Sequence, residues 1–222
     1  MNSPLGRSHP LTLHVNGERH GPLDIPEDLL LIDVLHEYLG LTGTRLVCGE
    51  GVCRACTVIV DSPDGSREVP SCVTRAHDFN GQRIRTIEGH AARDATGAVA
   101  TLSPVQQAFL DHFSFQCGYC TPGFVNAATL LLEKLAKSPV AGAELEAAIT
   151  EALNPHLCRC TGYVRYFQAV RELVLNTPGL VRQERRATAA PDPPCPQPMR
   201  DASHNAPTVA VTNDSAGTSL RK

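Results

Sequence analysis

The first half of the chain alternates hydrophobic and polar residues in the way that is typical of β-strands. Asn16-Gly17 follows the first alternating run and is a signal for a tight hairpin, so the chain is expected to return as a second strand. Pro26 is expected to open a helix that runs to Leu39. The predicted strands cover residues 11–15, 19–25, 57–60, 67–73 and 83–87. Together these elements predict a small α+β domain over residues 11–87.

From about residue 103 the hydrophobic positions recur at the spacing of helices instead. Ser103-Pro104 and Thr121-Pro122 each predict an N-cap that is followed by proline in the first helical turn. The predicted helices cover residues 104–113, 122–137, 143–153 and 163–176. We therefore expect a helical domain over residues 103–177, which a linker over residues 88–102 joins to the first domain.

The two ends of the chain differ in composition from the rest. Residues 1–10 are polar and lack the hydrophobic run of a secretory signal, so we expect a flexible N-terminus. Residues 178–222 are rich in Pro, Ala, Ser and Thr and contain no aromatic residue, which predicts a disordered C-terminal tail. Cys195 lies in this tail between two prolines and is predicted to be a free thiol without a function.

Composition narrows the classes of function. The formal net charge is −3 over 222 residues, which does not favour a protein that binds nucleic acid or an anionic membrane. No run approaches the roughly 18 apolar residues of a membrane span. Aromatic residues make up 5% of the chain and tryptophan is absent, so base-stacking platforms are not expected. We expect a cytoplasmic protein, or a periplasmic one if a partner that bears a signal carries it across the membrane.

Eight of the nine cysteines fall into two sets of four, and the first set has the spacing of a plant-type ferredoxin. In that pattern three thiolates from one loop and a fourth from a neighbouring segment surround a [2Fe–2S] cluster. Gly49 and Gly51 let the backbone approach closely, so that amide groups can point at sulfur. The predicted ligands of this first cluster are Cys48, Cys53, Cys56 and Cys72.

The second set consists of two pairs that lie beside predicted helix N-termini. Cys117 and Cys120 precede the helix predicted at residue 122, and Cys158 and Cys160 precede the last one. The partial positive charge of a helix N-terminus favours thiolates and an anionic cluster. Two such ends facing each other would form a cage of four thiolates, but the spacing alone does not separate an iron–sulfur cluster from zinc.

Three segments together resemble a known family. They are residues 48–58 (CGEGVCRACTV), 116–123 (QCGYCTPG) and 157–163 (LCRCTGY). These segments are similar to the small iron–sulfur subunit of molybdenum hydroxylases, the family of xanthine oxidase, aldehyde oxidoreductase and carbon monoxide dehydrogenase. The resemblance covers residues 11–176 in order, and it favours iron–sulfur clusters over zinc at both sets of cysteines.

The resemblance implies an N-terminal β-grasp ferredoxin-like domain and a C-terminal four-helix domain, each of which binds one [2Fe–2S] cluster. It also implies a large partner subunit that holds the molybdopterin cofactor and hydroxylates an aldehyde or an N-heterocycle. Electrons would pass through the second cluster and then the first to an FAD-binding medium subunit, a cytochrome c or another acceptor. The chain itself would then have no catalytic residue and no substrate site. In the family, residues at the positions of Gln116 and Cys160 lie against the pterin.

The chain departs from the family pattern at four positions, which are Val47, Arg54 and Pro155 in place of glycine and His156 in place of asparagine. Arg54 lies between two predicted ligands, so its charge is expected either to raise the potential of the first cluster or simply to be solvated. The alternative function is a free-standing double-cluster ferredoxin-like electron carrier. A third candidate is a structural zinc module that acts as a scaffold.

Overall fold

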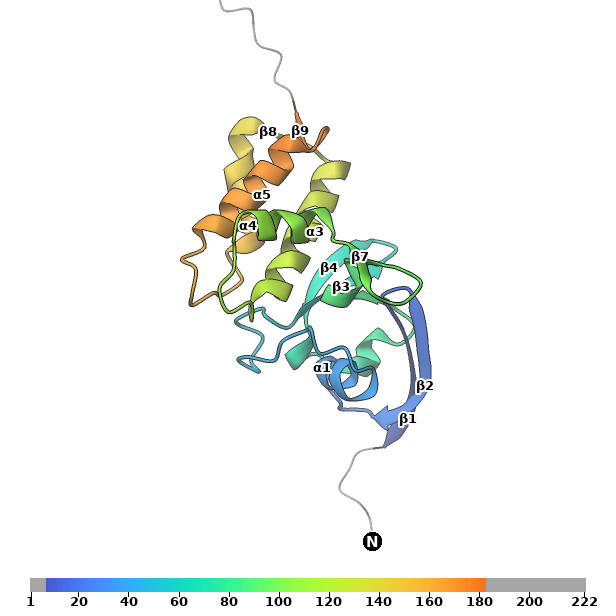
Figure 1. The fold of residues 1–222 in the computed structure, drawn as a ribbon. Helices are drawn as coiled ribbons and strands as arrows, with labels where there is room; N and C mark the ends of the chain where they lie inside the picture. The colour runs from blue at the N-terminus through green and yellow to red at the C-terminus, as the bar shows by residue number, and fades with distance from the viewer. Residues whose placement is uncertain (1–6, 183–222) are drawn as a thin grey trace, which may run out of the picture. The chain divides into compact units, whose positions relative to one another are not determined.

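The computed structural model describes residues 7–182, and a five-stranded sheet forms the first part of this range (Figure 1). Its strands are β1 (Ser8–Val15), β2 (Glu18–Pro26), β3 (Thr57–Ser62), β4 (Gly65–Pro70) and β5 (Arg83–Arg85). They lie in the order β2-β1-β5-β3-β4. β1 pairs antiparallel with β2 and parallel with β5, and β3 pairs antiparallel with both of its neighbours, so the sheet is mixed.

The alternating pattern of β1 places its apolar residues on one face of the sheet. Leu11, Leu13 and Val15 are buried in one hydrophobic cluster with apolar residues of β3 and β5, because successive side chains of a strand point to opposite faces. The hairpin predicted at Asn16 and Gly17 is confirmed, since both residues have positive φ angles, as a two-residue hairpin turn requires.

The helix predicted from Pro26 to Leu39 is wrong at its start. Pro26 ends β2, and Leu30 is still extended because the chain here pairs with the segment that follows β4. The N–H of Leu31 donates a hydrogen bond to the carbonyl of Thr74, so tertiary pairing delays the helix beyond its sequence signal. The helical part consists of α1 (Leu31–Asp33) and a π-helical turn, η1 (Val34–Tyr38).

Short elements fill the segments that the sequence assigns to a strand end and a linker. The strand predicted over residues 67–73 ends at Pro70, and Cys72 lies in the following 3-10 turn. The linker predicted over residues 88–102 contains a small antiparallel hairpin of β6 and β7. These elements are η2 (Ser71–Val73), η3 (Ala76–Phe79), η4 (Ile87–Gly89), β6 (Ala92–Arg93) and β7 (Val99–Thr101).

The second part of the described range is mainly helical. Its elements are α2 (Pro104–Asp111), α3 (Thr121–Lys137), β8 (Val140–Ala141), η5 (Gly142–Glu144), α4 (Leu145–Leu153), α5 (Val164–Asn176) and β9 (Val181–Arg182). The cap predicted at Ser103 is confirmed, because its hydroxyl accepts a hydrogen bond from the N–H of Gln106. The cap predicted at Thr121 is wrong: Cys120 is the N-cap of α3, and the Thr121 hydroxyl contacts that of Tyr166 at 2.9 Å instead.

Stacked aromatic rings form the centre of the helical part. Phe124 of α3 lies parallel to Tyr166 of α5 with 4.2 Å between the ring centroids, and Phe109 of α2 meets the same tyrosine edge-on. Leu180 is buried against this core, and β9 pairs with β8, so residues 178–182 belong to the helical part rather than to the predicted tail. The remainder of the predicted tail, with Cys195, lies outside the described residues, as do residues 1–6 of the predicted N-terminus.

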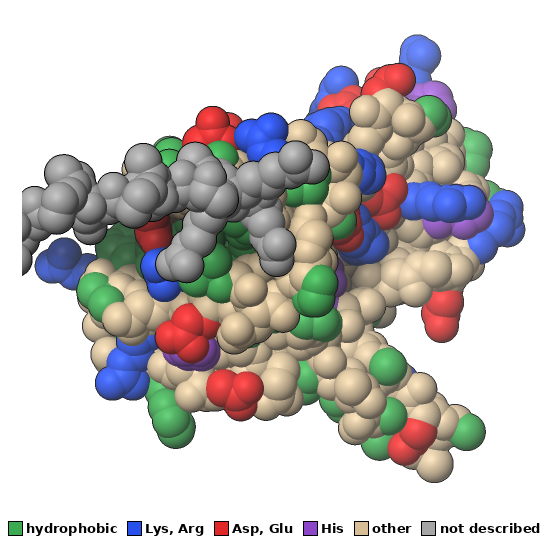
Figure 2. All heavy atoms as spheres, turned by 90° about the horizontal axis from the view of Figure 1, so that it is seen from above, with side chains coloured by type: hydrophobic (Ala, Val, Ile, Leu, Met, Phe, Trp, Pro, Cys, Tyr) green, Lys and Arg blue, Asp and Glu red, His purple; other side chains and the backbone are tan. Residues whose placement is uncertain are grey.

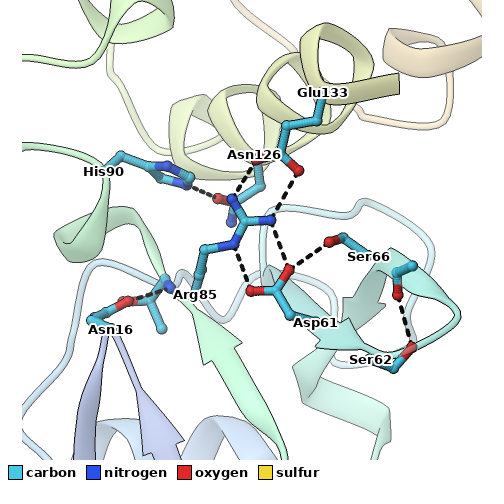
Figure 3. A network of polar contacts seen from close by, with 10 residues as sticks. Asn16, Asp61, Ser62, Ser66, Arg85, His90, Asn126 and Glu133 are labelled. Atoms are coloured by element: carbon cyan, nitrogen blue, oxygen red, sulfur yellow. Dashed lines mark hydrogen bonds and ion pairs between the residues drawn. The ribbon is translucent and has the colours of Figure 1, made fainter. Parts of the chain in front are cut away.

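A polar network joins the two parts, which belong to one compact unit (Figure 3). The Arg85 guanidinium at the end of β5 binds both Asp61 of β3 and Glu133 of α3, at 2.8 and 2.6 Å. Next to it the side-chain amide of Asn126 donates to the carbonyl of Thr57 at 2.6 Å, and its oxygen contacts the His90 ring. Helix α3 is therefore fixed against the start and the end of β3.

The surface charge and the helices bear on the expectations from composition. On the face shown in Figure 2, acidic and basic side chains are interspersed. A large field of positive charge, which would concentrate nucleic acid at the surface, is not seen on this face. Within residues 7–182, no helix has the length and apolar character that crossing a membrane requires.

Candidate iron–sulfur centres

The loop that precedes β3 shapes the first set of thiols. Gly49 and Gly51 have φ angles of +70° and +72°, a left-handed conformation that glycine adopts without strain. The loop curls around Cys48, whose sulfur lies 3.4 Å from the N–H of Glu50 and 3.5 Å from that of Cys53. These donors lower the pKa of the partly exposed Cys48 thiol to about 6, so the backbone of this loop favours a thiolate.

The thiols of the first set approach each other in two pairs. Cys53 lies beside Cys48, whereas Cys56 contacts Cys72, which the 3-10 turn after β4 brings in. Burial raises the pKa of the Cys56 thiol to about 12, which disfavours an uncompensated thiolate at that depth. A bound iron would supply the compensating positive charge, because thiols that bind a metal lose their protons.

The second set also forms two pairs, drawn from the loop before α3 and the loop between α4 and α5. The sulfur atoms of Cys117 and Cys160 lie 3.6 Å apart, and both residues are exposed. Cys120 and Cys158 form the inner pair, and burial raises the pKa of the Cys120 thiol to about 12. Burial raises the pKa of the Cys158 thiol, but hydrogen bonds to its sulfur, above all from the Thr161 hydroxyl at 3.1 Å, outweigh burial, so the pKa is lowered.

Only one pair of the second set lies directly at a helix N-terminus. Cys120 is itself the N-cap of α3, one residue earlier than the cap predicted at Thr121, whereas α5 begins at Val164, four residues after Cys160. Tyr163 interrupts the helix start with a φ angle of +70°, and its hydroxyl accepts a hydrogen bond from the N–H of Cys158. Side-chain hydrogen bonds with Tyr163 and Thr161 thus hold the loop of Cys158, in addition to any effect of a helix N-terminus.

The paired arrangement fits two-iron clusters. Within residues 7–182, no three Cys, His, Asp or Glu side chains meet closely enough to hold one metal ion. The thiols instead approach two by two in both sets, and a [2Fe–2S] cluster takes four thiolates with two on each of its irons. The donor set, the inward N–H groups and the glycine-rich loop therefore match the chemistry of such a cluster.

The two sets are neighbours because the loops that carry them touch. The N–H of Leu157, next to Cys158, donates a hydrogen bond to the carbonyl of Cys53 at 3.1 Å. The carbonyl of Arg54 faces Gly123 in the first turn of α3 so closely that a Cβ there would lie 2.4 Å from its oxygen. Arg54 itself has a φ angle of +61°, and it is half-buried. The backbone thus connects Cys53 of the first set to the residue that precedes Cys158 of the second set.

The sequence does not indicate the contacts of two residues near the thiols. The side chain of His156 is 1% exposed, and its Nε2 lies 3.0 Å from Glu68 of β4. Arg45 lies over the ring of Tyr119, 5.4 Å from its centroid. The partners in these two contacts are distant in the sequence, so no local spacing indicates them.

Gln116, which the resemblance places against the pterin, is exposed beside Cys117.

Comparisons with known proteins agree with a protein that carries two iron–sulfur centres. Residues 13–77 match the family described as 2Fe-2S iron-sulfur cluster binding domain, and residues 86–171 match the [2Fe-2S] binding domain family. The chain is 40% identical over 171 residues to the nicotine 6-hydroxylase small subunit of Paenarthrobacter nicotinovorans, covering 77% of this chain and 90% of that protein.

Two further proteins extend the comparison. The aldehyde oxidoreductase iron-sulfur-binding subunit PaoA of Escherichia coli is 34% identical over 182 residues, with 77% of this chain and 73% of that protein covered. The structure of quinoline 2-oxidoreductase from Pseudomonas putida 86 matches with a TM-score of 0.62 and 29% identity, over 79% of this chain and 94% of that chain. The chain therefore belongs to the family of small iron–sulfur subunits of molybdenum hydroxylases, and it binds two [2Fe–2S] clusters.

Proposed function

We propose that this chain is the electron-transfer subunit of a molybdenum hydroxylase, with Cys48, Cys53, Cys56 and Cys72 as ligands of the first cluster. The ligands of the second would be Cys117, Cys120, Cys158 and Cys160. The observation that carries the proposal is the hydrogen bond between Leu157 and Cys53, because it joins the two thiol sets through backbone. A [2Fe–2S] cluster, when bound, takes up and releases one electron at a time. The chain holds the thiolates in place and supplies N–H donors to sulfur.

The second thiol set is the proposed entry point for electrons. Cys117 and Cys160 are exposed, and the loops around them display uncovered apolar side chains. We define this entry face by Phe113, Tyr119, Leu157 and Val164, which are 74%, 49%, 49% and 60% exposed. Apolar area of this kind favours burial against a protein partner. The partner we propose is the large subunit that holds the molybdopterin, with Gln116 and Cys160 as the contacts to the pterin.

The first thiol set is the proposed exit. Cys48 is only partly covered, so an acceptor can approach that cluster from the surface. We propose an FAD-binding medium subunit or a cytochrome c as this acceptor, and an aldehyde or an N-heterocycle as the substrate of the large subunit. The relatives whose names mention nicotine, quinoline and aldehyde support these two substrate classes. In this assembly residues 11–87 would form the β-grasp domain and residues 103–177 the four-helix domain, and we propose a cytoplasmic location.

The test is purification of the full chain from its native source under anaerobic conditions. We expect the chain to elute with a larger molybdenum-containing subunit. Val164→Glu should abolish this association, because a charge then faces the apolar partner. Leu175→Glu is the matched control: Leu175 is 48% exposed on the same helix, about 16 Å along from Val164, and its variant should still bind. Elution of the wild-type chain alone and free of molybdenum would support a free-standing carrier and contradict the proposal.

A further inference from the structure

Arg45 is a cation that lies between the two thiol-bearing loops. It precedes Cys48 by three residues, and its N–H donates a hydrogen bond to the carbonyl of Ala55 in the same loop. Its guanidinium, however, lies over the ring of Tyr119, which stands between Cys117 and Cys120 of the second set. The backbone of Arg45 is therefore part of the first loop, whereas its charged group contacts the second loop.

The positive charge of the Arg45 guanidinium is not neutralised by a carboxylate and is only partly screened by solvent. In the range 7–182, the ion pairs of arginine and lysine involve other residues, and no carboxylate lies within 4.0 Å of the Arg45 guanidinium. The side chain is half-buried, and the face of an aromatic ring attracts a cation without neutralising it. Arg159, between Cys158 and Cys160, is by contrast exposed, so water screens its charge more strongly.

A fixed cation beside thiolate ligands acts on the redox equilibrium of the cluster that they hold. Reduction adds one negative charge, and a nearby positive charge stabilises the reduced form more than the oxidised form. Net charge, hydrogen bonds to sulfur and solvent exposure are the features by which a protein sets the potential of such a cluster. Because Tyr119 lies within the second set, the effect is expected mainly on the second cluster.

We propose that the Arg45–Tyr119 pair is an electrostatic device that raises the reduction potential of the second cluster. The ring holds the guanidinium in place, and the charge favours an electron on that cluster. This proposal rests on the ligand sets assigned under the proposed function. It adds a residue of the first loop that controls how readily the second cluster accepts an electron.

The experiment is a redox titration of the full chain, purified anaerobically, with the reduced clusters followed by electron paramagnetic resonance. At a fixed ambient potential, Arg45→Met should lower the ratio of reduced to oxidised second cluster by about three- to tenfold, where tenfold equals 59 mV for a one-electron couple. Arg45→Lys keeps the charge and should stay within about twofold of the wild type. Tyr119→Leu keeps every charge but removes the ring, and should lower the ratio by about threefold because the guanidinium is no longer held.

Arg67 offers a matched control. Its guanidinium lies 5.6 Å from the ring centroid of Phe79, which packs in the hydrophobic cluster of the sheet and not in the cluster of Cys56 and Cys72. Arg67→Met should leave the ratio unchanged, and an equal fall in Arg67→Met and Arg45→Met would show only an effect of net charge and overturn the proposal. A ratio within twofold of wild type in Arg45→Met would also overturn it.

Iron and sulfide analysis separates this proposal from the assignment of the ligands. Four irons and four sulfides per chain in the wild type and in all three variants of Arg45 and Tyr119 show that the clusters assemble, so that the ratio reports only on their potential. If Arg45→Met assembles poorly, Tyr119→Leu decides the question, because it leaves the charge of the loop unchanged. Absence of iron from the wild-type chain would instead contradict the ligand sets themselves.

Discussion

At the scale of single residues, Gly123 sets how closely the two thiol-bearing loops approach. Its position in the first turn of α3 faces the carbonyl of Arg54, and a Cβ there would also lie 3.0 Å from Nδ1 of His156. A side chain at position 123 would therefore clash with the Arg54 carbonyl, and the clash could be relieved only if the loop that carries Arg54 moved. The close contact of the two loops therefore depends on the missing side chain.

Gly123→Ala is expected to lower the free energy of unfolding by about 2 kcal/mol, because the new methyl group must push the Arg54 carbonyl away. Urea unfolding of the cluster-containing chain under anaerobic conditions measures this change. Gly142→Ala is the matched control: a Cβ at that position meets no atom within 4 Å, and the change should stay within about 0.5 kcal/mol. Equal stability of the two variants would show that the contact does not constrain the loops.

Residue types whose chemistry fixes their spacing could be read from the sequence, whereas residues that act through tertiary contacts could not. The spacing of the cysteines indicated two sets of four, and the structure brings the members of each set together as pairs. Arg45 and His156 carry no such signal, because Tyr119 and Glu68 reach them only after the chain has folded. The spacing also left zinc open for the second set, and the two-by-two approach of the thiols adds the geometric reason for a two-iron cluster.

At the scale of elements, the position of α3 against β3 depends on partly buried polar groups. The Asn126 side chain of α3 contacts both the Thr57 carbonyl and the His90 ring, and Arg85 pairs with Glu133 beside them (Figure 3). Burial lowers the pKa of His90, although the contact with Asn126 opposes this shift. Of the neighbouring charges, Arg85 lowers the pKa further and Glu133 raises it.

His90 is therefore expected to make the protein less stable in acid. Its pKa is lower in the folded chain than the ordinary value of 6.5, so the unfolded chain takes up a proton first as the pH falls below about 6.5. The neutral imidazole contributes its full stability above that pH and loses it progressively below. His90→Gln should show a smaller fall in thermal midpoint between pH 7.5 and pH 5.5 than the wild type, with both chains carrying their clusters. An identical fall in both chains would contradict this role.

Elements were predicted best where local pattern and tertiary structure agree. The alternation of β1 and the cap of α2 gave the right structures, because burial and capping act within a few residues. The helix predicted from Pro26 starts only at Leu31, since the intervening backbone pairs with residues near Thr74. The hairpin of β6 and β7 in the predicted linker has exposed strands, so no hydrophobic alternation marks it.

At the scale of the whole molecule, the two parts of the chain together hold two adjacent thiol sets in fixed positions. The sheet part supplies the first thiol set, the helical part supplies the second, and backbone hydrogen bonds and the Arg85 network join them in one compact unit. The four apolar residues of the entry face are exposed, as are Cys117 and Cys160, whereas Cys53, Cys56 and Cys72 are buried. This arrangement suits the proposed transfer of electrons from a partner at one centre to an acceptor at the other.

The most direct test of this account is an anaerobic reductive titration of the full chain followed by electron paramagnetic resonance. We predict two distinct signals, each from one electron, with four irons and four sulfides per chain. Cys56→Ser should remove only the signal of the first cluster, and Cys120→Ser only that of the second. A single signal in the wild type, or the loss of both signals in either variant with the fold intact, would contradict two separately ligated clusters.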